Sequence, residues 1–219
     1  MLKKKEILYN PYFLFPFLLW VVVGGVLLLV FSRSQLFYAI NTRYSDAADN
    51  AMYFATFLGQ GQVIVPALLL LMIFPRFRNV QYFITALCCN IIPFFIQQIL
   101  KSIFDHSRPH LLYYYETERM HYLQQWPLLY HRSFPSGHSQ GAFSFFCFLS
   151  LLLPSRYRKL GLVFFLLAIA VCYSRIYLTA HFFDDIYAGS ILGGSLTTII
   201  YALMNKYYSP LINNKDTFI

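Results

Sequence analysis

Apolar residues dominate six stretches of the chain, and short polar segments separate them. The stretches cover residues 12–31, 51–74, 80–104, 138–153, 160–177 and 185–203. A helix needs about 20 mostly apolar residues to cross a bilayer, because each residue rises about 1.5 Å across about 30 Å of hydrocarbon. The pattern therefore predicts an all-α bundle of six transmembrane helices. The fourth stretch is the shortest, and Pro66 and Pro93 lie within the second and third, where lipid-embedded helices tolerate kinks.

The composition agrees with a protein embedded in lipid. Charged residues make up 12% of the chain, against about 25% in soluble domains, and the mean hydropathy is +0.52. The length fits one domain, so we expect residues 1–219 to form a single membrane domain. Stretch 12–31 is longer than the apolar region of a signal peptide, so we expect it to stay in the protein.

The segment between the third and fourth helices, residues 105–134, has a different character. Its part from 111 to 131 is rich in tyrosine and contains Trp126. Both residue types favour the headgroup layer of a membrane. We expect this segment to lie at the outer interface beside the site, either as an anchoring loop or as a lid.

The distribution of charge predicts the orientation. With the amino terminus inside, the inner segments carry ten Lys and Arg residues against two acids, and the outer segments carry seven of each. An excess of cations on the cytoplasmic side is typical of membrane proteins. Both termini are therefore expected in the cytoplasm, and the basic balance indicates orientation rather than nucleic-acid binding. All six histidines then fall on the outer side.

Three polar clusters lie at the outer ends of predicted helices, at residues 101–109, 135–138 and 174–185. They contain the cations Lys101, Arg108 and Arg175 and three histidines, with no excess of acid over cations. One such cation could simply reach the interface, but burying three near lipid is costly. An anion with several oxygens would balance them, and the planar fork of arginine suits phosphate.

The motif Pro-Ser-Gly-His at residues 135–138 could add a second device for binding an anion. Ser136 is a candidate N-cap for the fourth helix, and the first-turn N–H groups beyond it are unpaired. Gly137 would let an oxyanion approach the backbone closely. Taken alone, the motif is equally an ordinary turn and cap.

His181 and Asp185 stand four residues apart, which makes them neighbours on a helix. A carboxylate on one imidazole nitrogen leaves the other free as a nucleophile or base. Asp184 could substitute for Asp185, and either could simply favour a helix start. The sequence contains no acid cluster that suggests magnesium.

The ordered motifs K-x6-R-P, P-S-G-H and S-R-x5-H-x3-D resemble those of the type 2 phosphatidic acid phosphatase superfamily. That family contains membrane lipid phosphatases and soluble vanadium haloperoxidases. The motifs span residues 101–185 and match at each defined position. The resemblance implies a site at the extracytoplasmic face of the cytoplasmic membrane, with no metal and no cofactor.

The resemblance also implies roles for individual residues. His181 would attack phosphorus and form a phosphohistidine, and Asp185 would orient it. His138 would protonate the leaving alkoxide and then activate water. The phosphoryl oxygens would be held by Lys101, Arg108, Ser136, Gly137 and Arg175.

The expected activity is removal of a phosphate from a membrane lipid that enters from the bilayer. Isoprenyl pyrophosphate, phosphatidylglycerol phosphate, phosphatidic acid and lipid A type phosphates all fit. Two alternatives stay open: transfer of the phosphoryl group to a second lipid, and lipid binding without catalysis. An oligomer is possible, since Gly189 and Gly193 could pack helices of two copies, but the sequence does not indicate one.

Overall fold

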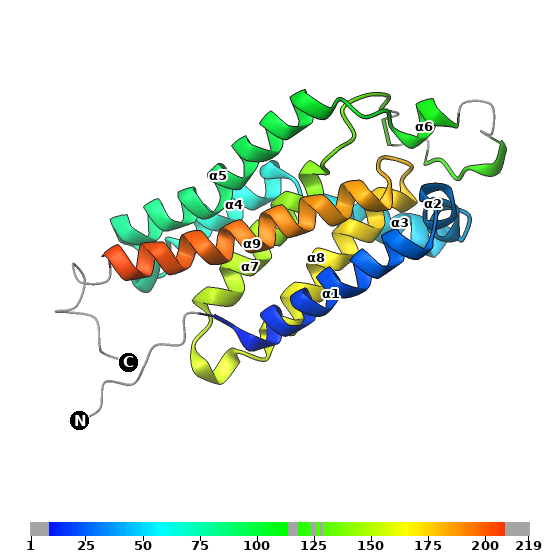
Figure 1. Ribbon diagram of the computed structural model, residues 1–219. Helices are drawn as coiled ribbons and strands as arrows, with labels where there is room; N and C mark the ends of the chain where they lie inside the picture. The colour runs from blue at the N-terminus through cyan, green and yellow to red at the C-terminus, as the bar shows by residue number, and fades with distance from the viewer. Residues whose placement is uncertain (1–8, 114–117, 124–125, 128, 209–219) are drawn as a thin grey trace.

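The computed structural model describes residues 9–113, 118–123, 126–127 and 129–208, and over these residues it contains helices and no strand. Five helices are long and run roughly along the bundle (Figure 1). They are α1 (Pro11–Val30), α5 (Val80–Phe104), α7 (Gly137–Leu152), α8 (Leu160–Tyr177) and α9 (Phe183–Tyr208).

Shorter helices connect the long ones. They are α2 (Arg33–Asn41), α3 (Asp46–Phe57), α4 (Gly61–Leu71) and α6 (Pro109–Leu112), with 3₁₀ turns η1 (Pro75–Phe77) and η3 (Ser155–Tyr157). Helices α2, α3 and α6 gather at one end of the bundle, and α1 begins at the other (Figure 1). The tyrosine-rich segment is described only in part, because residues 114–117, 124–125 and 128 lie outside the described residues.

Four described helices, α1, α5, α8 and α9, are long and apolar enough to cross a membrane. A fifth crossing results if α3 and α4 together form one bent span. Helix α7, the fourth predicted span, has 16 residues, which corresponds to about 24 Å. It packs against α5, α8 and α9, and ten of its residues are buried. Helix α7 is therefore short but surrounded largely by protein.

The prediction of one continuous helix over residues 51–74 is wrong. The chain bends by 59° between α3 and α4, and the bend lies at residues 58–60 rather than at Pro66, which is inside the continuous helix α4. Gly59 explains the position, because a Cβ there would lie 2.6 Å from the carbonyl oxygen of His138. The break lets the backbone of α3 and α4 approach the first turn of α7.

Helices α7 and α9 approach each other closely through two glycines. A Cβ at Gly189 would lie 2.5 Å from the carbonyl oxygen of Ser136, and one at Gly193 would lie 2.3 Å from that of Gln140. Residues without a side chain allow helices in membranes to pack this closely. In addition, the N–H of Ser136 donates to the carbonyl oxygen of Asp185 at 2.9 Å. This contact joins the first turns of α7 and α9.

Aromatic side chains fix α1 against α7 and α8. The ring of Phe13 lies 6.3 Å from that of Phe143 and 5.9 Å from that of Phe165, and Phe17 lies 5.6 Å from Phe143. Such edge-to-face and tilted pairs are favourable at these distances. The pattern of contacts places the apolar core among α1, α7 and α8.

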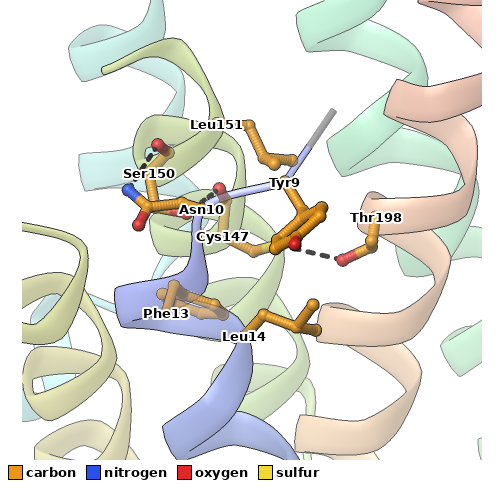
Figure 2. Close-up of a pocket in the computed structure, with 8 residues that line it drawn as sticks. All are labelled: Tyr9, Asn10, Phe13, Leu14, Cys147, Ser150, Leu151 and Thr198. Atoms are coloured by element: carbon orange, nitrogen blue, oxygen red, sulfur yellow. Dashed lines mark hydrogen bonds between the residues drawn. The ribbon is translucent and has the colours of Figure 1, made fainter. Parts of the chain in front are cut away.

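The end of the bundle where α1 begins is closed by Asn10. Its side chain caps α1 and donates to the carbonyl oxygens of Ser150 and Arg158. Beside it lies a cavity of about 10 Å³ (Figure 2), which is room for about one water molecule. The cavity is lined by Tyr9, Asn10, Phe13, Leu14, Cys147, Ser150, Leu151 and Thr198.

We predict that Gly193→Ala lowers the stability of the detergent-solubilised protein by about 1–3 kcal/mol, because the added methyl group meets backbone rather than a flexible side chain. The measurement is the midpoint of thermal unfolding. Gly61→Ala is the matched control, since nothing lies within 4 Å of a Cβ at that position. Equal midpoints for the two variants would contradict the close approach of α7 and α9.

Candidate functional site

The three polar clusters meet at the end of the bundle where α7 begins. Lys101 lies in the last turn of α5, Arg175 in the last turn of α8, and Asp185 in the first turn of α9. Arg108 and His181 lie in the connections after α5 and after α8. The structure thus brings together the eight residues singled out from the sequence: Lys101, Arg108, Ser136, Gly137, His138, Arg175, His181 and Asp185.

The His181 ring is buried between a guanidinium and a carboxylate. Nη1 of Arg108 lies 3.1 Å from its Nε2, and Oδ2 of Asp185 lies 3.4 Å from its Nδ1. Arginine can only donate hydrogen bonds, so Nε2 must be the acceptor and Nδ1 must carry the proton. This tautomer presents the lone pair of Nε2 on the side of the cations.

Asp185 is held by more than the histidine. Its Oδ2 accepts a hydrogen bond from the N–H of Phe182 at 2.9 Å and a short one from the hydroxyl of Ser133. The same hydroxyl lies 3.3 Å from Nδ1 of His181. Ser133 is therefore a buried link between carboxylate and imidazole, and it restricts the movement of both.

Arg108 uses most of its hydrogen-bonding capacity within the protein. Besides His181, it donates to the carbonyl oxygens of Ala180, His131 and Arg132 at 2.7, 2.8 and 3.2 Å. A guanidinium has five N–H donors, so within the described residues one is left for a ligand. Arg108 thus organises the loops around His181 and can offer only limited contact to a phosphate.

Arg175 is fully buried at the end of α8. Its Nη1 donates to the hydroxyl of Thr56 at 2.6 Å, and its guanidinium carbon lies 4.8 Å from the ring centre of Trp126. Its Nε is buried without a hydrogen-bond partner among the described residues. A buried donor without an acceptor costs free energy, and an anionic ligand would supply the acceptor.

The first turn of α7 has the structure that its sequence suggests. Ser136 is the N-cap, and its hydroxyl accepts from the N–H of Ser139. Gly137 follows, with the Gln97 amide 3.4 Å from the position of a Cβ. Nε2 of His138 is buried and has no partner within the described residues. The positive end of the helix dipole and an open imidazole nitrogen therefore lie at one place.

Asp184 points to a different partner from Asp185. It forms an ion pair with Arg33 of α2, with 2.9 Å between Nη2 and Oδ2. Arg33 also lies 3.6 Å from Oδ1 of Asp185 and stacks on the ring of Phe182. The two adjacent carboxylates share Arg33 but differ in their other contacts, and Asp185 is the one beside the histidine.

A metal ion could find ligands in this region. Three potential ligand atoms lie within 4.8 Å of one another, one from each of His106, Asp184 and Asp185. This group could not be predicted from the sequence, because His106 is far along the chain from Asp184 and Asp185. In this structure Arg33 supplies positive charge to the same two carboxylates.

Sequence reasoning missed four residues that contact the site: Arg33, Thr56, Trp126 and Ser133. All four lie outside the three motifs, and only the tertiary fold brings Arg33 and Thr56 near the site. Trp126 lies in the segment that was expected beside the site, and Ser133 stands two residues before Pro135 and so close to the second motif.

The electrostatics of the site favour a neutral His181. Burial, together with the charges of Arg108, Arg175 and Lys101, holds the pKa of the His181 imidazole well below its usual value of 6.5. A proton on this ring would add another positive charge to a cationic cluster. At neutral pH the ring is therefore unprotonated at Nε2.

Comparison with known proteins decides the family. A model of the PAP2 superfamily matches residues 80–209. An undecaprenyl-diphosphatase of Sulfolobus acidocaldarius is 30% identical over 163 residues, which cover 73% of this chain and 72% of that protein. The chain belongs to the PAP2 superfamily. The resemblance of its motifs to the type 2 phosphatidic acid phosphatases is thereby confirmed.

Solved structures agree with the PAP2 assignment. LpxE of Aquifex aeolicus has a TM-score of 0.62 and 27% identity, covering 81% of this chain and 98% of its own. A transmembrane PAP2 type phosphatidylglycerolphosphate phosphatase of Bacillus subtilis shares the fold, with a TM-score of 0.67, 20% identity and coverage of 90% and 98%. The PAP2 chain is thus a membrane lipid phosphatase, a hydrolase.

We predict that the His181 ring of the PAP2 chain stays neutral as the pH falls through 6.5, because its pKa is lowered. The measurement is ¹⁵N NMR of histidine-labelled protein in detergent micelles, with His181→Asn to identify the resonance. Free histidine in the same micelles is the reference. A protonation midpoint at or above 6.5 would contradict the cationic, buried environment.

Proposed function

We propose that the chain hydrolyses a phosphate monoester or diphosphate on a membrane lipid through a phosphohistidine at His181. The observation that carries this proposal is the fixed tautomer of His181, with Nδ1 toward Ser133 and Asp185 and Nε2 beside Arg108. A neutral imidazole with its lone pair beside a cationic cluster is suited to attack phosphorus.

In the first step, Nε2 of His181 attacks the phosphorus and the bond to the leaving oxygen breaks. His138 gives its proton to that oxygen. The charge of the bound phosphate offsets the surrounding cations, which allows His138 to hold that proton. Arg175, Lys101 and the first-turn amides of α7 stabilise the equatorial oxygens, because phosphoryl transfer depends mainly on alignment and charge.

In the second step, His138 removes a proton from water, and the water oxygen attacks the phosphohistidine. The bond between nitrogen and phosphorus breaks, and inorganic phosphate leaves. Asp185 stabilises the positive charge that develops on His181 during the first step, and Ser133 fixes the carboxylate in place. The site returns to its starting state with no further reactant.

One curated relative favours a lipid diphosphate as substrate, because it is an undecaprenyl-diphosphatase. The residues that the family model matches contain the three motifs. We therefore place a polyprenyl diphosphate first, ahead of phosphatidylglycerol phosphate, phosphatidic acid and lipid A type phosphates. The cationic cluster is compatible with each of these headgroups.

We place the site at the outer face of the cytoplasmic membrane, with both termini in the cytoplasm and six crossings that include α7. The described basic residues of the turns after α4 and α7 support this orientation, since those turns lie at the end of the bundle opposite the site. Lys3, Lys4, Lys5 and Lys215, which also entered the charge argument, lie outside the described residues.

The proposal is tested with purified protein and a panel of lipids that carry a labelled terminal phosphate, including polyprenyl diphosphate and phosphatidic acid. We expect free labelled phosphate, with the largest kcat/KM for the diphosphate, and the same rates with a chelator present. Transfer of the label to a second lipid would show that the chain is a phosphotransferase and would overturn the proposed hydrolysis. Chelator inhibition that magnesium reverses would contradict the metal-free mechanism.

The neighbouring aspartates provide a matched pair of variants. We predict that Asp185→Asn lowers kcat by about 10²- to 10⁴-fold, as for other carboxylates that orient a catalytic histidine, because its amide can donate and favours the wrong tautomer. Asp184→Asn loses an ion pair that is partly exposed and should change kcat by less than about threefold. His181→Asn should abolish turnover. Equal losses in the two Asp variants would contradict the assignment of Asp185.

A further inference from the structure

Trp126 lies directly on the proposed catalytic groups although it belongs to none of the three motifs. Its ring centre is 4.8 Å from the guanidinium carbon of Arg175 and 6.2 Å from the ring centre of His138. On α3, the rings of Tyr53 and Phe57 each lie 6.4 Å away. The indole is therefore held by aromatic neighbours in contact with two groups that would act on phosphate.

The polar atom of this indole has no partner. Trp126 Nε1 is buried and makes no hydrogen bond within the described residues. Indole N–H groups usually find an acceptor when they are buried. Headgroup water explains an indole at a membrane surface, but the buried position of this N–H argues against that explanation.

Two neighbouring polar atoms share the same deficit. Nε of Arg175 and Nε2 of His138 are also buried without a partner among the described residues. The Arg175 and Trp126 atoms are both donors, so neither can satisfy the other. One group with several acceptor oxygens would satisfy both, and a phosphoryl group has that chemistry.

We propose that Trp126 is a substrate-binding residue whose indole N–H donates a hydrogen bond to an oxygen of the transferred phosphoryl group. This inference rests on the proposed function for the location of that group. The indole face keeps its contact with Arg175 while the N–H edge binds the oxygen. Trp126 thus adds a neutral side-chain donor beside the cations, the Ser136 hydroxyl and the backbone amides.

The chain offers a direct way to observe this contact, since it has two tryptophans, Trp20 and Trp126. Trp20 lies on α1, where it donates to the hydroxyl of Ser190 at 2.8 Å and packs against Phe183, and it is none of the residues proposed to bind phosphate. In a Trp20→Phe variant all tryptophan emission comes from Trp126. We expect inorganic phosphate to change the intensity or wavelength of that emission, with saturation near the inhibition constant of phosphate.

Trp126→Phe keeps an aromatic ring and removes only the donor. We expect it to raise the inhibition constant of inorganic phosphate by about tenfold, since a hydrogen bond to a charged group is lost. Trp20→Phe is the matched control and should leave that constant unchanged. The thermal unfolding midpoint of each variant, measured in the same detergent, reports whether the fold is kept.

Two results would overturn the inference. One is an inhibition constant in Trp126→Phe within twofold of the unchanged protein, and the other is Trp126 emission that does not respond to phosphate. The emission readout measures phosphate binding without turnover, whereas the inhibition constant is obtained from turnover. A missing emission response is therefore distinguishable from failure of the phosphohistidine proposal, which His181→Asn tests.

Discussion

The close approach of α7 and α9 is the constraint on which the site depends. Gly189 and Gly193 allow the two backbones to touch, and the N–H of Ser136 then reaches the carbonyl oxygen of Asp185. This one contact brings the open amides of a helix start beside the aspartate that holds His181. A wider separation would leave an anion site and a histidine that could not act on the same phosphorus.

Around that contact the protein gathers positive charge with few acids to balance it. The cost of burial is lowered by uncharged partners: backbone carbonyls for Arg108, and a threonine hydroxyl and an indole face for Arg175. These partners hold the cations without neutralising them. The positive potential is therefore available to a ligand, and burial together with that potential lowers the pKa of the His181 imidazole.

The long helices and the motif residues could be predicted from sequence because they depend on local patterns. Apolar length locates α1, α5, α8 and α9, and fixed spacing locates His181 and Asp185. The break at Gly59 could not be predicted, since it depends on the His138 carbonyl oxygen against which the glycine packs. Thr56 and Arg33 could not be predicted for the same reason. Their roles arise from contacts between distant segments, which no local pattern records.

The hydrogen bonds of Arg108 have a consequence for how its variants are interpreted. Because the side chain joins the carbonyl oxygens of residues 131, 132 and 180, replacing it releases two loops at once. Lysine has three donors on a single nitrogen and cannot reproduce the planar fork. Loss of activity in an Arg108 variant would therefore report disordered loops as much as a lost contact with substrate, because one side chain serves both purposes.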